Sequence, residues 1–341
     1  NNWNIVDRTW KNIMDSTHNH PDFSNVMHRD NLLEDLKSSN ELLDSITQGL
    51  NAYLEAKRHG FPRFFFLSND ELISILSHTK DFNQIQKSMN KLFEYVQTIT
   101  VDDNSMITAM NDDGLETVEF ERPINGDTPE IEDWLNAFEG EMKATLKELI
   151  GDSLIQFPNM KKEEWIAEYP AQVILIANQI LWTQQVTTSL DARVLRQLKL
   201  LQQKFVEGLT LLTNMVRQKL TPAIRQAISC LLINDVHNRD IIASLTKQEI
   251  IDPDSFKWQV QLRYYWEDET VIVRSINNVY EYSYEYAGNS ARLVITPLTD
   301  RCYQTLLSSF KQNLGGAPSG PAGTGKTETV RDCAKALGRP C

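Results

Sequence analysis

Residues 320–327, Gly-Pro-Ala-Gly-Thr-Gly-Lys-Thr, constrain the fold of this chain more than any other stretch. They fit the pattern G-x-x-x-x-G-K-[ST], in which glycines let the backbone close around an anion and successive N–H groups point at a phosphate. In this pattern Lys326 reaches the β- and γ-phosphate oxygens, and the Thr327 hydroxyl is a Mg²⁺ ligand. With average residue usage, an accidental match in a chain of this length has a chance of about 1%. The motif therefore predicts a site for ATP or ADP with Mg²⁺.

A helix is expected directly after this loop, because its positive N-terminal end would also face the phosphates. The sequence supplies one apolar stripe at helical spacing, formed by Val330, Cys333, Ala334 and Leu337. Gly338 then predicts the C-terminal end of the helix. Before the loop, residues 314–318 (Leu-Gly-Gly-Ala-Pro) give only a weak strand pattern.

Composition limits the classes of protein to which this chain can belong. The 341 residues are enough for two or three domains, with 41% hydrophobic and 23% charged residues, as is ordinary for a globular protein. The formal net charge of −12 argues against a nucleic-acid or anionic-membrane partner, and no apolar run is long enough to span a bilayer. The four cysteines have no C-x-x-C spacing, which favours reduced thiols in an intracellular protein.

The first 125 residues alternate between helical and extended patterns. Residues 1–60 have helical spacing and end at Gly60 and Pro62, after which the aromatic run 61–67 predicts a short buried strand. Further helices are expected after the N-cap sequence that begins at Ser68 and over residues 85–96. Residues 105–120 then predict a β-hairpin around an Asp-Gly turn, and residues 123–129 a polar connector.

From Ile131 to about residue 250 the pattern is strongly helical. One amphipathic stripe consists of Ile131, Trp134, Leu135, Phe138, Met142, Leu146, Leu149 and Ile150. Residues 173–182 are apolar most of the way round, which predicts a central buried helix. Further helices are expected from 194 to 216 and over 223–233. Residues 258–266 and 271–273, with the alternating tyrosines 280–286, then predict strands.

Several stretches resemble dynein heavy chains as a set. The stretches near the C-terminus are residues 284–290 (Tyr-Glu-Tyr-Ala-Gly-Asn-Ser), 292–303 (Arg-Leu-Val-Ile-Thr-Pro-Leu-Thr-Asp-Arg-Cys-Tyr) and 315–320, with the loop continued as Thr327-Glu328-Thr329. Upstream, residues 57–58, 61–71, 169–173 and 179–183 resemble the family's linker. These sequences are more similar to those of axonemal than of cytoplasmic dyneins, and residues 169–173 and 234–237 are more similar to outer-arm chains.

This resemblance implies a domain organisation and a set of site residues. Residues 1–285 would be the C-terminal part of the linker, with a β-rich strip near 258–286, and residues 286–341 the beginning of the first AAA+ module. The residues that would contact the adenine base are Leu293, Val294, Ile295, Pro297 and Leu298. Those that would hold the triphosphate are Gly320, Pro321, Ala322, Gly323, Thr324, Gly325, Lys326, Thr327 and Glu328. Lys326 and Thr327 would be catalytic, and Thr327 would bind the metal.

The expected fold is mainly α, an elongated helical-bundle arm with small β-hairpin insertions followed by a truncated α/β P-loop (AAA+) segment. By resemblance the chain is a piece of a microtubule motor ATPase in the axoneme of cilia or flagella, inactive by itself. Its partners would be microtubules, through regions not in this sequence, and other dynein heavy, intermediate and light chains. The alternative function is a non-catalytic helical scaffold with a regulatory or vestigial nucleotide loop. A small P-loop kinase is disfavoured, because only 14 residues follow Thr327.

Overall fold

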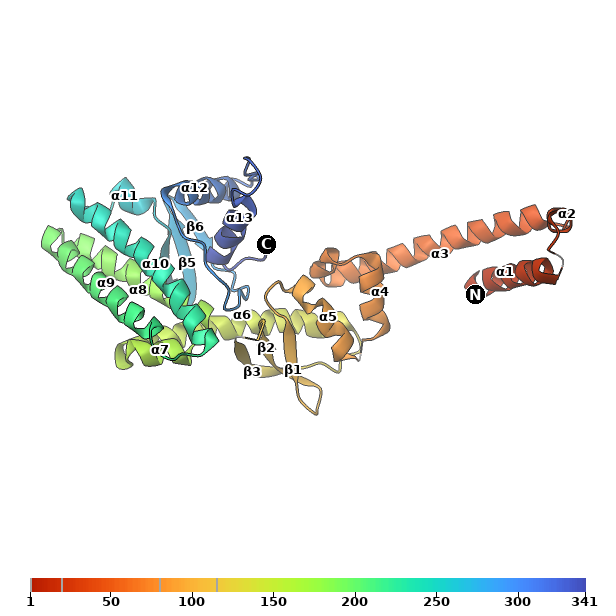
Figure 1. Cartoon of the computed structure of the whole chain (residues 1–341), viewed down its shortest axis with the longest axis horizontal. Coiled ribbons are helices and arrows are strands. Elements are labelled where there is room, and N and C mark those ends of the chain that lie inside the picture. The colour runs from red at the N-terminus through yellow and green to blue at the C-terminus, as the bar shows by residue number, and fades with distance from the viewer. Residues whose placement is uncertain (1, 20, 80, 115) are drawn as a thin grey trace. The chain divides into compact units, whose positions relative to one another are not determined.

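The computed structural model describes residues 2–19, 21–79, 81–114 and 116–341 of the chain. Its elements fall into two compact units, Asn1–Thr79 and Lys80–Cys341, which we call the N-terminal unit and the main unit (Figure 1). Most elements are helices, and the strands form two small three-stranded sheets in the main unit. The prediction of a mainly helical chain with small β insertions is therefore confirmed.

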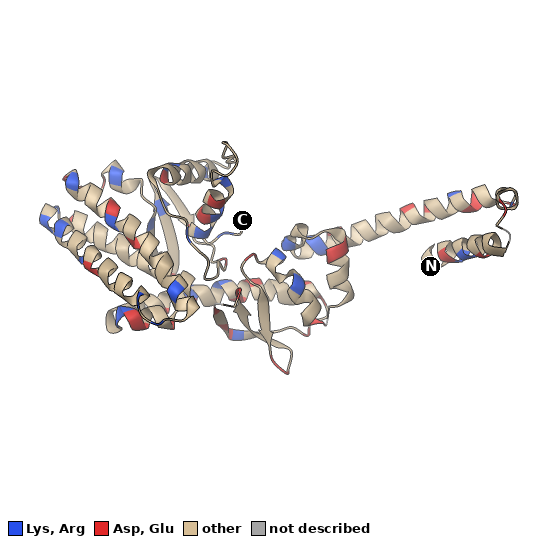
Figure 2. Cartoon of the chain, in the orientation of Figure 1, with Lys and Arg blue, Asp and Glu red and all other residues tan. Residues whose placement is uncertain are grey.

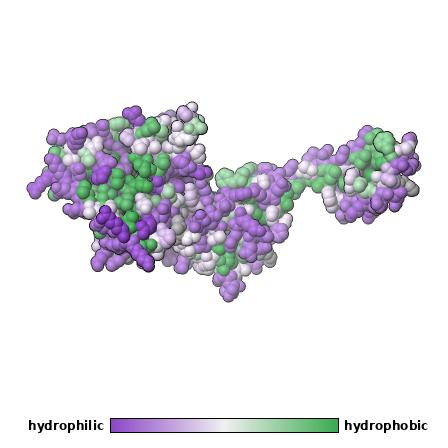
Figure 3. Space-filling model, viewed as in Figure 1, coloured by the Kyte–Doolittle hydropathy of each residue, from purple (hydrophilic) through white to green (hydrophobic). Residues whose placement is uncertain are grey.

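The regular elements of the N-terminal unit are all helices over its described residues. Its elements are α1 (Asn2–Asn19), α2 (Phe23–Met27), α3 (Leu32–Gly60), the 3₁₀ helix η1 (Pro62–Phe66) and α4 (Asn69–Ser77). Helix α1 packs against α3, and several large apolar side chains of the pair stay exposed, including Trp10 at 54% and Leu33 at 65%. Figure 3 shows hydrophobic patches on this pair of helices, beside hydrophilic surface. The predicted cap of α4 is present, because Ser68 and Glu71 form a reciprocal capping box.

The strand predicted for residues 61–67 is wrong, because this segment forms the 3₁₀ helix η1. Pro62 fixes its own φ angle and donates no hydrogen bond, which suits the first turn of a helix. The N–H of Phe64 then donates to the carbonyl of Phe61 at 3.0 Å. Phe61 and Phe64 are buried three positions apart, whereas Phe65 and Phe66 are 56% and 61% exposed. A run of aromatic residues thus divides between core and surface with the period of a helix.

The first part of the main unit packs a sheet against one long helix. Helix α5 (Phe82–Leu92) precedes the antiparallel strands β1 (Thr98–Val101), β2 (Met106–Asn111) and β3 (Thr117–Asn125), in that order across the sheet. Strand β3 packs on α6 (Ile131–Gln156), whose predicted stripe is buried except for the partly exposed Leu149. The hairpin is confirmed. The polar connector predicted from residue 123 begins later, because β3 continues to Asn125.

Helix α8 (Ala171–Asp191) is the central helix of the unit, as its uniformly apolar sequence predicts. It packs against α6, α9 (Leu195–Val216) and α10 (Pro222–Lys247), and the short α7 (Lys162–Glu168) packs on α8 and α10 (Figure 1). Part of its core is the edge-on pair of Trp182 and Trp258, whose ring centroids are 5.3 Å apart.

Helix α10 runs 14 residues beyond the predicted end at residue 233. The sequence hides this continuation, because its buried face is polar at Asn234, Asp235 and Asn238. The Asn178 amide of α8 donates to Asp235 at 2.7 Å, and the Asn238 amide donates to Gln179 at 3.2 Å. Hydrogen bonds between two helices therefore replace the apolar periodicity on which the prediction relied.

The second sheet is smaller than its sequence pattern predicts. Strands β4 (Arg263–Glu267), β5 (Thr270–Ser275) and β6 (Asn278–Glu281) are antiparallel and lie in that order, with β4 against α8. The alternation that begins at Trp258 does not start a strand, because residues 256–259 form the short helix α11 (Phe256–Gln259) after a turn at Asp252. Helices α12 (Pro297–Lys311) and α13 (Lys326–Ala336) complete the unit.

Charge and hydropathy of the surface agree with the composition. Figure 2 shows acidic and basic residues interspersed along the visible helices of both units. Within the described ranges, none of the helices combines the length and the apolar character that crossing a membrane requires.

Candidate nucleotide-binding loop and its supports

The loop 320–327 is an exposed turn that leads directly into α13. Gly323 and Gly325 both have φ near +75°, a left-handed conformation that favours glycine and that places Gly325 at the N-cap of the helix. A Cβ atom added to either glycine would meet no heavy atom within 4 Å, so both glycines lie in open space. The glycines are therefore needed here for backbone conformation rather than for close packing.

Lys326 folds back over the loop. Its ammonium donates to the carbonyl oxygens of Gly320 at 2.9 Å and Pro321 at 2.5 Å, and lies 3.4 Å from the Thr324 hydroxyl. The Thr324 hydroxyl also donates to the Pro321 carbonyl at 2.9 Å. The positive charge is thus held at the loop by neutral acceptors. A phosphate oxygen is a stronger, charge-assisted acceptor for the same ammonium.

The first turn of α13 presents free donors to the loop. Hydrogen bonding within α13 begins at Thr329, whose N–H and hydroxyl donate to the carbonyl of Gly325 at 2.9 and 2.8 Å. The N–H groups of the first three helical residues therefore have no helical acceptor, and the helix dipole adds partial positive charge at this end. Thr327 is exposed in this turn. Donors, dipole and ammonium together form a site suited to an anion.

The other end of α13 is docked onto the second sheet. The Tyr264 hydroxyl on β4 donates to the carbonyl of Ala336 at 2.9 Å, and the N–H groups of Ser283 and Glu285 donate to the carbonyls of Leu337 and Gly338 at 2.9 and 2.7 Å. Burial raises the pKa of Tyr264, which keeps its hydroxyl a donor. Helix α13 is therefore anchored at its C-terminal end, while its N-terminal end and the loop are exposed.

The buried face of α13 differs from the predicted stripe. Cys333 and Leu337 are buried as expected, but Val330 and Ala334 are only partly buried, and Thr329 and Asp332 occupy the core. Sequence reasoning therefore missed Asp332, which is 3% exposed. A carboxylate three residues before Lys335 on an otherwise apolar face was the available signal.

Asp332 collects donors from three segments. In the Arg292 guanidinium, Nε lies 2.9 Å from Oδ1 of Asp332 and Nη2 lies 3.1 Å from Oδ2. The backbone N–H of Leu293 donates to Oδ1 at 3.2 Å, and the Tyr303 hydroxyl donates to Oδ2 at 2.5 Å. Burial would lower the pKa of the Arg292 guanidinium, but Asp332, Tyr264 and Tyr303 together outweigh this effect and raise the pKa. The guanidinium therefore keeps its positive charge at neutral pH.

The segment predicted to contact adenine has a mixed exposure. Val294 and Leu298 are 62% and 73% exposed, and Ile295 lines a surface groove of about 560 Å³ with residues of α10 and α11. Pro297 is the first residue of α12, so the segment ends inside a helix. In the part of the chain that the structure describes, no hydrogen bond or ion pair joins residues 293–298 directly to residues 320–327. Their link is Asp332. The weak strand pattern at residues 314–318 forms no strand.

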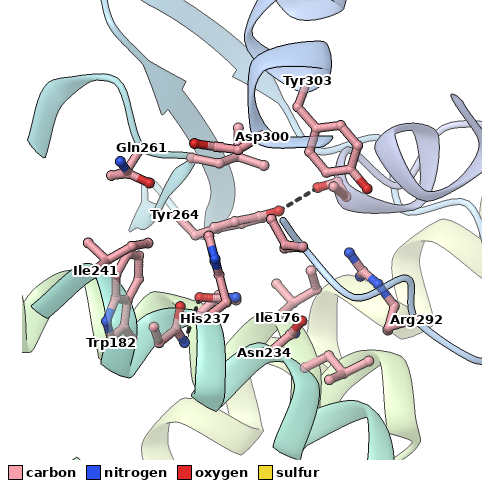
Figure 4. Close-up of a pocket in the computed structure, with 16 residues that line it drawn as sticks. Ile176, Trp182, Asn234, His237, Ile241, Gln261, Tyr264, Arg292, Asp300 and Tyr303 are labelled. Carbon is pink, nitrogen blue, oxygen red and sulfur yellow. Dashed lines mark hydrogen bonds between the residues drawn. The ribbon is translucent and has the colours of Figure 1, made fainter. Parts of the chain in front are cut away.

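A small polar cavity lies behind Arg292. It has a volume of about 40 Å³ and is enclosed by α8, α10, β4 and α12, with Tyr264, Asp300 and Tyr303 on one side and His237 and Asn234 on the other (Figure 4). Among the described atoms, Asn234 Oδ1, Asn238 Oδ1 and Trp182 Nε1 are buried without a hydrogen-bond partner. A polar cavity of this size accommodates ordered water. Burial lowers the pKa of His237 and raises that of Asp300.

Residues 282–289 form a junction between the two sheets and the helices. The buried Gln172 amide, at the start of α8, donates to the Tyr282 hydroxyl and the Glu285 carbonyl, both at 2.8 Å, and accepts from the N–H of Ala287 at 2.8 Å. The Tyr286 hydroxyl donates to Glu116, near the hairpin of the first sheet, at 3.0 Å. The loop helix is thus tied through one peptide segment to the helical array.

Comparisons with known proteins match the two ends of the chain to one family. Residues 1–153 match the family model of "Dynein heavy chain, N-terminal region 2", and residues 282–341 match that of "Hydrolytic ATP binding site of dynein motor region". The chain is 42% identical over 339 residues to human "Dynein axonemal heavy chain 3" and 43% identical over 338 residues to human "Dynein axonemal heavy chain 12". These alignments cover 99% and 98% of this chain but only 8% and 11% of the two relatives.

Proposed function

We propose, from the premise that this chain belongs to the dynein heavy chain family, that residues 320–327 bind ATP with Mg²⁺ for a microtubule motor. The chain spans about a tenth of the length of its relatives, so the motor would be a longer heavy chain that carries this segment. Its axonemal relatives favour a place in the axoneme of a cilium or flagellum, with microtubules and other dynein chains as partners.

The two matched regions support a division of labour within the chain. Residues 1–285 would be the linker, a mechanical arm, and residues 286–341 the beginning of the first AAA+ module. The junction at 282–289 is where the two would meet, because its hydrogen bonds reach the first sheet, α8 and the end of α13. ATP binding at the loop would reach the arm through this segment.

One observation carries the assignment of the site. The Lys326 ammonium is held over the mouth of the loop, 2.9 Å from the Gly320 carbonyl, at the N-terminal end of a helix whose other end is anchored. A phosphate placed there meets the ammonium, the free N–H groups and the helix dipole at once. Thr327 would hold Mg²⁺, which neutralises charge on the phosphates. The protein's contribution is then to position the phosphates and to stabilise their negative charge.

The chain by itself is expected to hydrolyse no ATP. Both of its sheets are antiparallel, and residues 312–325, which precede α13, contain no strand in the described structure. A P-loop normally follows a strand of a parallel sheet, which helps to fix the loop and the water-activating groups. Steady ATP turnover by the purified 341-residue chain that disappears in Lys326→Ala would contradict this expectation.

The site assignment is tested in the longer heavy chain by nucleotide titration. Lys326→Ala is expected to weaken ATP binding by about 2–4 kcal/mol, because a charge-assisted phosphate contact is lost. Arg331→Gln is the matched control, since it removes one positive charge from the exposed face of the same helix. Fluorescent-nucleotide titration, with other nucleotide sites disabled, measures both variants. Unchanged affinity in Lys326→Ala would favour the alternative, a scaffold with a vestigial loop.

A further inference from the structure

We propose that Asp332 is a positioning residue that fixes both ends of segment 293–298 relative to the phosphate loop, and that it thereby governs recognition of the nucleotide base. The inference rests on the proposed function, because it concerns the same site. It adds a division between two tasks. Lys326 would hold the phosphates, and Asp332, five residues beyond Thr327 on the same helix, would hold the segment that the family resemblance assigns to the base.

The N-terminal end of the segment is held by two donors to Asp332. The Arg292 guanidinium forms a two-pronged ion pair with the carboxylate, and the Leu293 N–H donates to Oδ1 at 3.2 Å. The side chains of Arg292 and Asp332 are only 11% and 4% exposed. A buried carboxylate with fixed partners has one orientation, because any rotation would break hydrogen bonds that water cannot replace.

The C-terminal end of the segment is held by the same carboxylate through α12. The Tyr303 hydroxyl donates to Oδ2 at 2.5 Å, from a position less than two turns after Pro297. Thr296 and Thr299 form a capping box that joins the segment rigidly to α12. One side chain of the loop helix therefore fixes the entry and the exit of residues 293–298.

Asp332 is the charged side chain of α13 that contacts both ends of segment 293–298. Lys335, one turn further along α13, donates to the Ser290 hydroxyl at 2.9 Å, which is upstream of the segment. No other charged side chain of α13 bonds to residues 292–303 in the described structure. A change at Asp332 or Tyr303 should therefore shift the segment relative to the loop, while the loop and Lys326 keep their own local contacts.

The test compares a base-bearing ligand with one that has only phosphates. In the longer heavy chain, dissociation constants are measured for ATP, GTP and inorganic tripolyphosphate, each with Mg²⁺. Tyr303→Phe removes one hydrogen bond to Asp332 and leaves the ion pair, so it should fold. We expect its preference for ATP over GTP to fall about three- to tenfold, which is less than the full effect of one hydrogen bond to a charged group, with tripolyphosphate affinity unchanged.

Tyr280→Phe is the matched control, because the Tyr280 hydroxyl donates to the Leu307 carbonyl of the same α12 at 2.6 Å without touching Asp332. It should lower the melting temperature without changing the preference for ATP over GTP. Asp332→Asn, followed by thermal unfolding, should lower both the preference and the stability. The inference is overturned if the parent protein has no base preference, if Tyr303→Phe keeps it, or if both tyrosine variants lose it equally.

Failure of the proposed function gives a different result. If Lys326→Ala does not weaken tripolyphosphate binding, residues 320–327 are not the phosphate site, whatever the base preference. If Lys326→Ala does weaken it and Tyr303→Phe leaves the ratio of ATP to GTP affinity unchanged, the site stands and only the role of Asp332 is wrong.

Discussion

The side-chain amide of Gln172, in the first turn of α8, donates a 2.8 Å hydrogen bond to the hydroxyl of Tyr282, 110 residues further along the chain. The same amide is bonded to the backbone of Glu285 and Ala287. Gln172 is 4% exposed, so water does not compete for these bonds. The contact joins the central helix to the segment that leads into the proposed nucleotide module, which makes it a point where the two parts are held together.

Gln172→Leu should destabilise the main unit by about 2–4 kcal/mol, because the partly buried N–H of Ala287 loses its partner and two further hydrogen bonds, to Tyr282 and Glu285, are broken. Chemical unfolding followed by tryptophan fluorescence measures this. Gln184→Leu, an exposed position on the same helix, is the control and should change stability by less than about 0.5 kcal/mol. Equal stability of the two variants would show that the junction contributes nothing.

His237 should make stability depend on pH in the mildly acidic range. Burial lowers its pKa below the ordinary value of 6.5, so the folded state favours the neutral ring while the unfolded state takes up a proton near pH 6.5. The free energy of unfolding should therefore fall as the pH is lowered from about 7 through 6.5 and below. His237→Gln should remove this part of the decline.

The measurement is a series of denaturant unfolding curves between pH 7.5 and 5.5 for both proteins. Their difference in stability should shift in favour of the variant as the pH falls. A constant difference across this range would mean that His237 has the same pKa in the folded and unfolded states.

The helical arm should act as a lever with two poses. Among the described residues of 80–285, no cluster of side chains could hold a metal ion. This region does contain close-packed helices such as α6 and α8, whose core residues are almost fully buried. Close-packed helices deform little and move as bodies about hinges. Nucleotide state would then select a bent or a straight arm through unequal contacts with the rest of the motor.

Distances between a label near residue 60 and one elsewhere in the longer heavy chain test this, in ATP-like and nucleotide-free states. We expect two distributions of the label-to-label distance, whose populations change with the nucleotide state, and Lys326→Ala should abolish this change. One unchanged distribution in both states would leave only a static spacer.

Features that depend on local periodicity or on a short motif could be predicted from the amino-acid sequence. The loop 320–327 with its following helix, the buried α8 and the amphipathic α6 were all predicted, because each is encoded by neighbouring residues. The same local signal failed at residues 61–67, where a proline turned an apolar run into a 3₁₀ helix, and at residues 258–262, where an apparent alternation belongs to a short helix and a turn.

The positions of the polar side chains in the core could not be predicted in this way and became visible in the folded structure. Gln172 and Asp235 carry no sign of burial in the sequence, and Asp332 carries only its place on a mostly apolar helix face, because a buried polar group is stable only when partners from distant segments meet it. Arg292, Leu293 and Tyr303 supply those partners to Asp332, and residues 282–287 supply them to Gln172. A local pattern specifies a helix and its apolar face, whereas pairing between residues 29 to 115 positions apart exists only once the chain has folded.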